Sequence, residues 1–357
     1  MQELLRRRVG KGRGAIAVGT LLLVAIAAAL APAADDNVTI EPREKWGNVF
    51  AGKEVDFHFA VKAPRGSKGR AAWNFSIVNR RTISSGETGL PAGGGKVGVR
   101  LRVPEIKDGV VLRARLRISV LAEGEEKAQA VYDKTVWIFP EDPFTGRKKW
   151  LKGLKIVLFD PEKTTAGPLK KGKVPFEELN NPAAIGELKE GLLIVGEGVS
   201  FRDYPDLGEA MVRAAAGGLP VLCLAPAAGS LALPGADNPR LPAPGGLAFR
   251  RADFITELDK RLDAEAWPPE GKVAIRGLLL KAEERTVVTE VTREPGGWPW
   301  VEVNYPDHKS KLVVCGFGLL GKAWAAGPTP RFLLARLLEY VAPKAEDEPA
   351  REKESQR

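Results

Sequence analysis

Cysteine and histidine are scarce in this sequence, with two residues of each among 357. Two thiols allow at most one disulfide, and no metal-ligand spacing occurs, so no metal and no cofactor are expected. Cys223 and Cys315 lie in the apolar stretches VLCLAP and LVVCGF, which favours buried free thiols. A disulfide stays open as an alternative in an oxidising compartment. His58 and His308 have too few partners for a metal site and are expected to be structural or exposed.

Long apolar runs are also missing, except for Ala15 to Leu30. Basic residues precede this run from Arg6 to Arg13, and the small residues Ala31-Pro32-Ala33-Ala34 follow it. The pattern predicts that residues 1–34 are a secretory signal peptide or, if uncleaved, a signal-anchor with its basic end inside. Both alternatives place the remainder outside the cytoplasm, secreted, periplasmic or anchored, with no membrane contact beyond this segment.

The net charge of +9 is partly a property of this leader. Residues 1–34 contain five Lys or Arg and one Glu, so the remainder holds 49 basic and 44 acidic residues, a net charge of +5. Nucleic-acid binding requires a clustered basic face with aromatic residues placed for stacking, and neither is evident. The basic run Arg147-Lys148-Lys149 is assigned to a solvated linker over residues 141–152.

Residues 38–140 alternate apolar and polar side chains with a period of two. The clearest case is Val110 to Val120, in which Arg113, Arg115 and Arg117 alternate with apolar residues. Such alternation is typical of half-buried antiparallel strands. Turn signals separate about six or seven such strands, which predicts a β-sandwich resembling immunoglobulin or fibronectin type III domains. Modules of this kind usually bind, space or present something rather than catalyse.

The pattern of strands and helices in residues 153–343 predicts an α/β domain with a mainly parallel sheet. Leu192 to Val195 and Val221 to Leu224 are short apolar runs typical of strands covered on both faces, and a helical pattern with a Gly217-Gly218 stop lies between them. Further elements are expected as a strand over 155–160, helices over 182–189, 255–267 and 330–341, strand character over 273–292, and a hairpin around Pro306-Asp307. The tail, residues 344–357, is charged and expected to be disordered.

Gly218 to Ala225, GLPVLCLA, resembles the strand that leads into the nucleophile turn of class I glutamine amidotransferases. In that family a G-x-P-x-x-G-x-C run places a cysteine on a tight strand-to-helix turn. The resemblance covers roughly residues 153–341 and implies an amidotransferase-like α/β fold. Matching Gly218 and Pro220 puts Ala225 at the nucleophile position, and no His-x-Glu pair follows. The resemblance therefore implies a catalytically degenerate domain, in an arrangement similar to bacterial secreted or anchored proteins.

Ligands of parallel sheets bind beyond the carboxyl ends of the strands, so the polar residues there are the site candidates. They are Asp160, Glu197, Ser200 and Ser230, with Asp203 nearby. Carboxylates and hydroxyls gathered at this edge could bind sugar hydroxyls or a cation, or they could cap helices and lie solvated in loops. Trp298 and Trp300 could form an aromatic surface for a glycan, or belong to the core. Catalysis at Cys223 is not expected, since no base adjoins it.

Three functions stay open. The first is a non-enzymatic extracytoplasmic binding or scaffolding protein, whose sandwich presents the α/β domain to envelope proteins or glycans. The second is a carbohydrate-active hydrolase or accessory protein that uses Asp160 and Glu197 as its carboxylate pair, which requires both groups to face one open cleft. The third is a purely structural envelope component without a saturable ligand.

Overall fold

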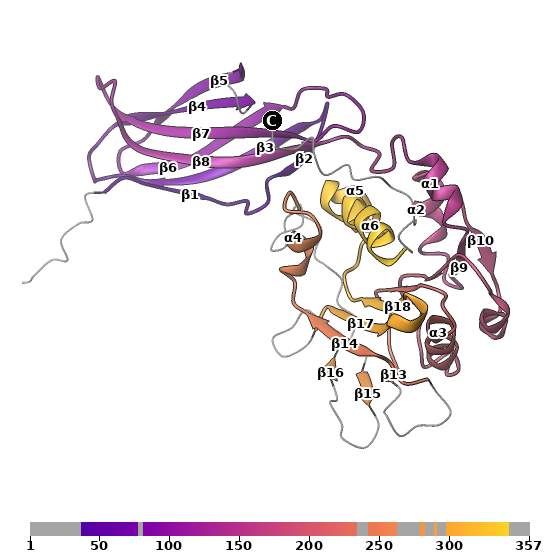
Figure 1. Ribbon diagram of the computed structural model, residues 1–357. Coiled ribbons are helices and arrows are strands. Elements are labelled where there is room, and N and C mark those ends of the chain that lie inside the picture. The colour runs from indigo at the N-terminus through magenta and orange to yellow at the C-terminus, as the bar shows by residue number, and fades with distance from the viewer. Residues whose placement is uncertain are drawn as a thin grey trace, which may run out of the picture. The chain divides into compact units, whose positions relative to one another are not determined.

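The computed structural model describes residues 37–77, 81–233, 242–262, 279–282, 289–290 and 298–342. Figure 1 colours them from indigo at the N-terminal strands to yellow at the C-terminal helices. The predicted leader, residues 1–34, and the predicted tail, residues 344–357, lie outside the described residues. No helix among the described ranges combines the length and the apolar character needed to cross a lipid bilayer.

The first part of the chain is a mostly antiparallel sheet region. It contains a five-stranded sheet in the order β2-β8-β7-β4-β5 and a three-stranded sheet in the order β1-β3-β6. Among the described strands of this region, β2 and β8 pair in parallel and the other pairs are antiparallel. The strands are β1 (Thr39–Pro42), β2 (Asn48–Phe50), β3 (Glu54–Lys62), β4 (Gly69–Ile77), β5 (Arg81–Leu90), β6 (Gly94–Arg102), β7 (Leu112–Ala122) and β8 (Ala128–Phe139). The predicted antiparallel strands are confirmed at this level.

Alternation along each strand determines which side chains are buried in this region. In β7 the arginines Arg113, Arg115 and Arg117 are exposed, while Leu116 and Ile118 are fully buried. Side chains from both sheets belong to one hydrophobic cluster, which includes Phe57, Phe59, Phe75, Val97, Val99, Leu116, Ile118 and Val136. A shift of one residue in any of these strands would turn its apolar side chains toward solvent. Burial of this cluster therefore determines how the strands pair in register.

A seven-stranded, mostly parallel sheet forms the centre of the second part. Its order is β10-β9-β11-β12-β18-β17-β14, parallel from β10 to β18 and antiparallel for β17 and β14. A second sheet has the order β13-β15-β16. The strands are β9 (Ile156–Phe159), β10 (Glu177–Leu179), β11 (Leu192–Val195), β12 (Val221–Leu224), β13 (Ser230–Leu233), β14 (Gly246–Arg250), β15 (Leu279–Ala282), β16 (Thr289–Glu290), β17 (Trp300–Tyr305) and β18 (Ser310–Cys315).

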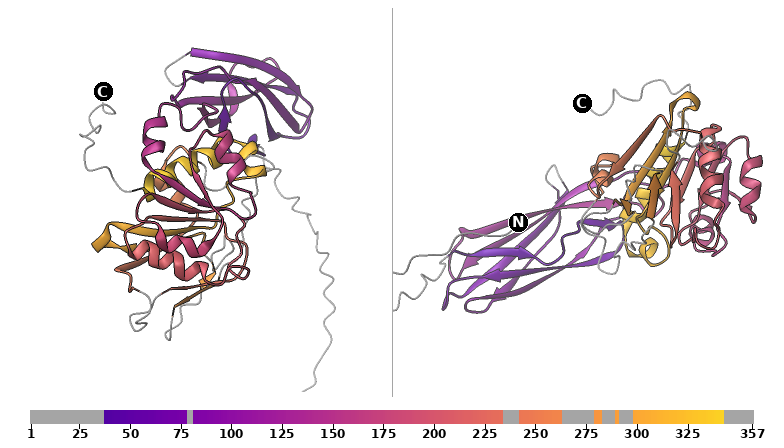
Figure 2. Two further views of the ribbon diagram at one scale, coloured as in Figure 1. Left: turned by 90° about the vertical axis from the view of Figure 1, so that its right-hand side faces the viewer. Right: turned by 90° about the horizontal axis from the view of Figure 1, so that it is seen from below.

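Helices lie on both faces of the seven-stranded sheet (Figure 2). One face packs against α1, α2, α4 and α6, and the other packs against η1 and α3. The expected unit of β11, α3 and β12 is confirmed, with Leu193 opposite Val221 in a parallel pair. The helices are α1 (Lys148–Gly153), α2 (Ala166–Lys171), α3 (Leu207–Ala216), α4 (Phe254–Leu258), α5 (Lys322–Ala326) and α6 (Pro328–Val341), and the 3₁₀ turns are η1 (Pro182–Glu187) and η2 (Pro306–His308).

The connection β9-α2-β10 runs to one side of β9, and the chain then returns to place β11 on its other side. This reversal between β9 and β11 is the topological switch point of the sheet, where ligands of doubly wound proteins bind. A ligand site of this sheet would therefore lie beside the residues that follow β9 and β11, which are Asp160 and Gly196-Glu197.

Several elements differ from their predicted extents. The helix expected over 255–267 is only α4, because Asp259 adopts an extended conformation and ends it, and residues 263–267 lie outside the described ranges. The segment expected as a helix over 182–189 is the 3₁₀ turn η1. Strand character expected over 273–292 is described only at β15 and β16. The expected hairpin is confirmed as β17 and β18 around η2.

Residues 141–152, which the sequence suggested as a solvated linker, are partly helical and partly buried. Phe144 and Leu151 are 2% and 1% exposed and belong to the cluster that also contains Phe332 of α6. Phe139, at the end of β8, contacts Phe332 with ring centroids 4.6 Å apart. Phe144 and Leu151 therefore pack this segment against the helices that cover one face of the sheet. The basic residues Arg147-Lys148-Lys149 had suggested a solvated segment instead.

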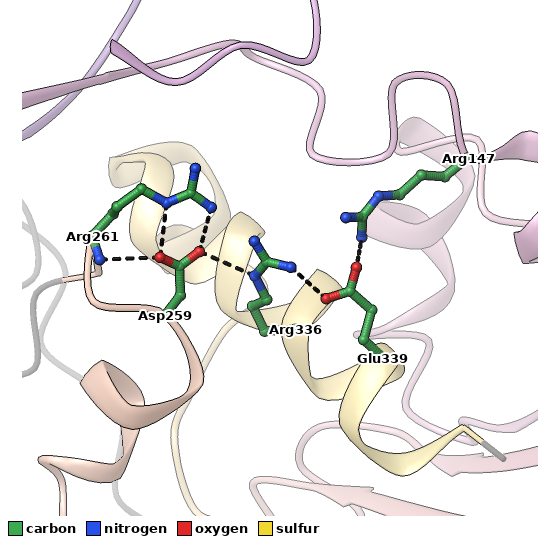
Figure 3. A network of polar contacts seen from close by, with 5 residues as sticks. All are labelled: Arg147, Asp259, Arg261, Arg336 and Glu339. Carbon is green, nitrogen blue, oxygen red and sulfur yellow. Dashed lines mark hydrogen bonds and ion pairs between the residues drawn. The ribbon is translucent and has the colours of Figure 1, made fainter. Parts of the chain in front are cut away.

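A network of ion pairs joins the end of α4, helix α6 and the residue before α1 (Figure 3). The buried Asp259 accepts two hydrogen bonds from the Arg261 guanidinium, at 2.8 and 2.6 Å, and one from Arg336 Nε at 3.0 Å. Arg336 also donates to Glu339 at 2.6 Å, and Glu339 pairs with Arg147. Burial alone would raise the pKa of Asp259, but the bonds and charges of Arg261 and Arg336 leave it below its usual value.

Candidate functional site at the carboxyl edge of the parallel strands

Asp160 follows β9 at the switch point and is only 4% exposed. Its Oδ2 accepts hydrogen bonds from the backbone N–H groups of Thr165, at 2.9 Å, and Ala166, at 2.8 Å. The Thr164 hydroxyl lies 3.3 Å from Oδ1. The carboxylate thus satisfies N–H donors at the beginning of α2 that have no partner within the helix. Asp160 acts as a structural acceptor in this arrangement.

Gly196 allows β11 to end directly beside this carboxylate. A Cβ atom at Gly196 would lie 2.4 Å from Asp160 Oδ1, closer than real Cβ contacts. The crevice between the ends of β9 and β11 is therefore filled by the aspartate side chain and has no space for a further group at this point.

Glu197 binds a different loop. Its Oε2 accepts hydrogen bonds from the backbone N–H groups of Leu319, at 3.1 Å, and Leu320, at 2.8 Å. Its own N–H donates to Thr165 Oγ1 at 2.8 Å, and its carbonyl oxygen accepts from the Thr164 hydroxyl. Glu197 therefore connects the loops that follow β9, β11 and β18, three segments far apart in sequence.

These contacts weigh against a glycosidase pair. A general acid and a nucleophile must both present free carboxyl oxygens to a substrate between them. Asp160 and Glu197 instead each use a carboxyl oxygen for two backbone N–H donors. Replacing these bonds with contacts to a sugar would leave two loops with unpaired N–H groups, which is costly wherever those groups are buried.

The hydroxyl candidates do not join the two acids. Ser200 Oγ accepts a hydrogen bond from the backbone N–H of Asp203 at 3.3 Å, the pattern of a local serine turn. Asp203 is exposed, and so is Ser230, the first residue of β13. The structure thus brings Asp160 and Glu197 to one edge, connected through Thr164 and Thr165.

Ala225 follows β12, has φ = 29° and is 1% exposed. This φ lies in the left-handed region, which residues with a Cβ seldom adopt. The alanine N–H donates to the Cys315 carbonyl oxygen at 2.6 Å, and its carbonyl oxygen accepts from Gly198 N–H at 3.0 Å. The chain then enters β13, whereas the nucleophile turn of the amidotransferases enters a helix.

The segments after β11 and β12 continue to pair beyond the sheet. Ala227 N–H donates to the Val199 carbonyl oxygen at 2.9 Å, and Phe201 N–H donates to the Ala228 carbonyl oxygen at 2.8 Å. Backbone hydrogen bonds thus connect the loops that follow β11 and β12 at the carboxyl edge. The cavities beside β2 and β3 and beside Phe144 and Leu151 have none of the site candidates in their lining.

The two cysteines are free and fully buried. Leu224, the neighbour of Cys223, pairs with Cys315 across β12 and β18, so the two thiols point to opposite faces of the sheet. Accordingly Cys223 belongs to the cluster on the α3 face and Cys315 to the cluster on the α6 face. This geometry is incompatible with a disulfide between them.

We expect neither cysteine to react with Ellman's reagent in the folded protein. Burial raises the pKa of the Cys223 thiol, and it raises that of Cys315 to about 12, so neither forms a thiolate at neutral pH. Absorbance of the released thionitrobenzoate measures the reaction, and denaturing urea should yield two equivalents per chain. Rapid labelling of a native thiol would contradict this expectation.

The tryptophans expected as a glycan surface or core are separated. Trp300 is 1% exposed and packs against Phe254 and Tyr340, with ring centroids 4.8 and 5.7 Å away. Trp298 precedes β17 and packs against the cluster on the other face, with the Arg251 guanidinium 3.8 Å from its ring centroid. The rings do not share a face, so they do not form one glycan platform.

Among the described residues no group of three or more His, Cys, Asp and Glu side chains could hold a metal ion. His308 is exposed in η2. His58 is paired through Nδ1 with Glu44 at 2.7 Å. The site residues that sequence reasoning missed are Thr164 and Thr165, whose hydroxyls contact the backbone of Glu197.

No protein-family model and no curated protein matches the sequence. The chain is weakly similar to the periplasmic chaperone SfaE, with 8% identity over 29% of this chain and 58% of the chaperone and a TM-score of 0.23. A β-glucosidase from Listeria innocua matches with 10% identity over 29% of this chain and 16% of the enzyme, TM-score 0.22. The CARDB domain of a Pyrococcus furiosus protein matches with 16% identity over 29% and 87%, TM-score 0.21. Scores this low carry no argument about fold or function.

Proposed function

We propose that this chain is a non-catalytic extracytoplasmic binding or scaffolding protein. The observation that carries the proposal is that Asp160 and Glu197, the acids at the switch point, each accept two backbone N–H groups. An active site would keep such groups available to a substrate. Here both carboxylates hold loops in place through hydrogen bonds to the backbone, which supports a structural role for this edge of the sheet.

The remaining reactive groups support the same proposal. Ala225 occupies the position that the amidotransferase resemblance assigns to the nucleophile, and it is 1% exposed. Both thiols are buried on opposite faces of the sheet. In the proposal, the C-terminal part is a degenerate amidotransferase-like domain and the N-terminal part an immunoglobulin-like β-sandwich that presents it to envelope proteins or glycans. The basic and apolar residues of 1–34 motivate the extracytoplasmic location.

The proposal is tested by incubating the full chain with glutamine, an aryl ester and an aryl glycoside and following ammonia or chromophore release. We expect no turnover above buffer, and none after Ala225→Cys, because a side chain at this position is shielded from solvent. Reproducible turnover that Glu197→Gln abolishes and the exposed control Glu162→Gln retains would overturn the proposal. Near-UV circular dichroism verifies that each variant is folded.

A further inference from the structure

A cavity of about 540 Å³ lies beside β2 and β3 and the turn between α5 and α6. Its volume falls within the range of ordinary ligand sites. Much of its lining is apolar, with Trp46, Val49, Phe50, Val55 and Pro328 contributing to it. Trp46 and Val49 are largely buried, at 7% and 5% exposure, so they form the floor of the cavity.

One side of β3 is unpaired next to this cavity. β6 pairs with the whole of β3, but β1 pairs only with residues Phe59–Lys62. Beyond β1, Arg43 N–H donates to the His58 carbonyl oxygen at 2.8 Å, and Glu44 Oε2 accepts from His58 N–H at 2.7 Å. No described strand pairs with residues 54–57 on this side.

The direction of the free backbone groups follows from the pairing of His58. Backbone N–H and C=O groups of a strand turn to alternate sides, and β3 pairs with β6 without a bulge. Because His58 turns its groups toward the β1 side, Asp56 and Glu54 turn theirs the same way. Two donors and two acceptors are thus aligned for one more strand, the arrangement by which sheets bind extended peptides.

Three carboxylates lie around this edge, and two of them already have basic partners, Glu44 with His58 and Asp56 with Arg100. Glu44, Glu54 and Asp56 line the cavity together with Lys53 and His58, and Lys53 pairs with Glu141 at 2.7 Å. This local excess of carboxylates contrasts with the net charge of +9 of the whole chain. Arg100 already pairs with both carboxyl oxygens of Asp56, at 2.8 and 3.2 Å, and its hydrogen bonds lower the pKa of that carboxyl, so Glu54 carries more of the uncompensated charge. Glu54 is exposed at the edge itself.

We propose that the unpaired edge of β3 at Glu54 and Asp56 binds an extended peptide segment of a partner protein that alternates apolar residues with Lys or Arg. An added strand would place every second side chain beside Val55, toward the apolar floor. Its other side chains would lie beside Glu54 and Asp56, where cross-strand pairs of opposite charge are stabilising. This proposal rests on the binding role proposed above and uses a surface separate from the carboxyl edge.

The test uses three synthetic nine-residue peptides with valine at alternate positions and lysine, serine or glutamate at the others. Binding to the full chain is measured by calorimetry, and hydrogen exchange of the β3 amides is measured with and without peptide. We expect the lysine peptide to bind most tightly and the glutamate peptide least. The bound lysine peptide should slow exchange at Glu54 and Asp56.

A charge reversal and a matched control complete the test. Glu54→Lys should weaken binding of the lysine peptide about threefold or more and strengthen binding of the glutamate peptide, because it replaces an attractive cross-strand charge pair with a repulsive one. Glu125→Lys, at another exposed glutamate, should change neither affinity. Absence of binding, equal binding of the three peptides, or binding without slower exchange in β3 would each overturn the proposal. The turnover assays do not depend on this outcome, so the two proposals can fail separately.

Discussion

Replacing Asp160 with alanine is expected to lower the free energy of unfolding by about 2–6 kcal/mol. The carboxylate accepts two backbone N–H groups and is 4% exposed, so alanine leaves both donors without a partner. Each buried donor left unsatisfied costs about 1–3 kcal/mol. Urea unfolding, followed by circular dichroism, measures the change.

Two further variants define what this result means. Asp160→Asn keeps one carbonyl acceptor and should cost less than Asp160→Ala. Glu162→Ala, two residues away and exposed, should change stability by about 0.5 kcal/mol or less. If Asp160→Ala were as stable as the parent protein, Asp160 would not hold the N–H groups at the start of α2, and its carboxylate would be free at the switch point.

Replacing Asp259 with alanine is expected to cost about 2–3 kcal/mol, which is less than the roughly 3–5 kcal/mol for breaking a fully buried ion pair because its partners are partly exposed. Arg261 and Arg336 have side-chain exposures of 29% and 28% and would lose their shared carboxylate. Equilibrium unfolding in urea measures this loss. Asp253→Ala, at an exposed position before α4, is the matched control and should be near neutral.

The same variant should change the acid dependence of stability. The pKa of Asp259 is lower in the folded protein than its usual value, so the folded state favours the ionised form. Its contribution is fully present above the pKa of the unfolded chain, about 4, and is lost as pH falls through the folded value. The parent protein should therefore lose more stability than Asp259→Ala between pH 5 and about pH 2. Parallel pH profiles would contradict the assigned role of this carboxylate.

The order of an antiparallel region followed by a mostly parallel sheet could be predicted because its strands carry strong patterns. Leu192–Val195 and Val221–Leu224 are uninterrupted apolar runs, and Arg113 to Arg117 alternate with apolar residues. β5 (Arg81–Leu90) was not predicted, because RTISSGETGL contains small and polar residues without alternation. Its strand conformation depends on pairing with β4, which a single segment does not encode.

The location of the candidate site could be predicted, but the partners of its residues could not. Asp160 and Glu197 lie at the strand ends where the topology rule places them. The carboxylate oxygens of both residues, however, accept from backbone N–H groups, which every residue except proline has. The donors to Glu197, Leu319 and Leu320, also lie more than 120 residues away in sequence. The residue types in the sequence therefore carried no signal for the contacts of either carboxylate with backbone N–H groups.

The position of β18 has a consequence for how the chain folds as it is synthesised. β18 (Ser310–Cys315) pairs with β12 (Val221–Leu224), and about ninety residues separate them in sequence. Until β18 emerges, β12 has an unpaired apolar edge, and such edges template association between chains. Because contacts between distant residues form slowly, the nascent chain spends this interval exposed to aggregation. The topology therefore makes protection of β12 important while the chain is being synthesised.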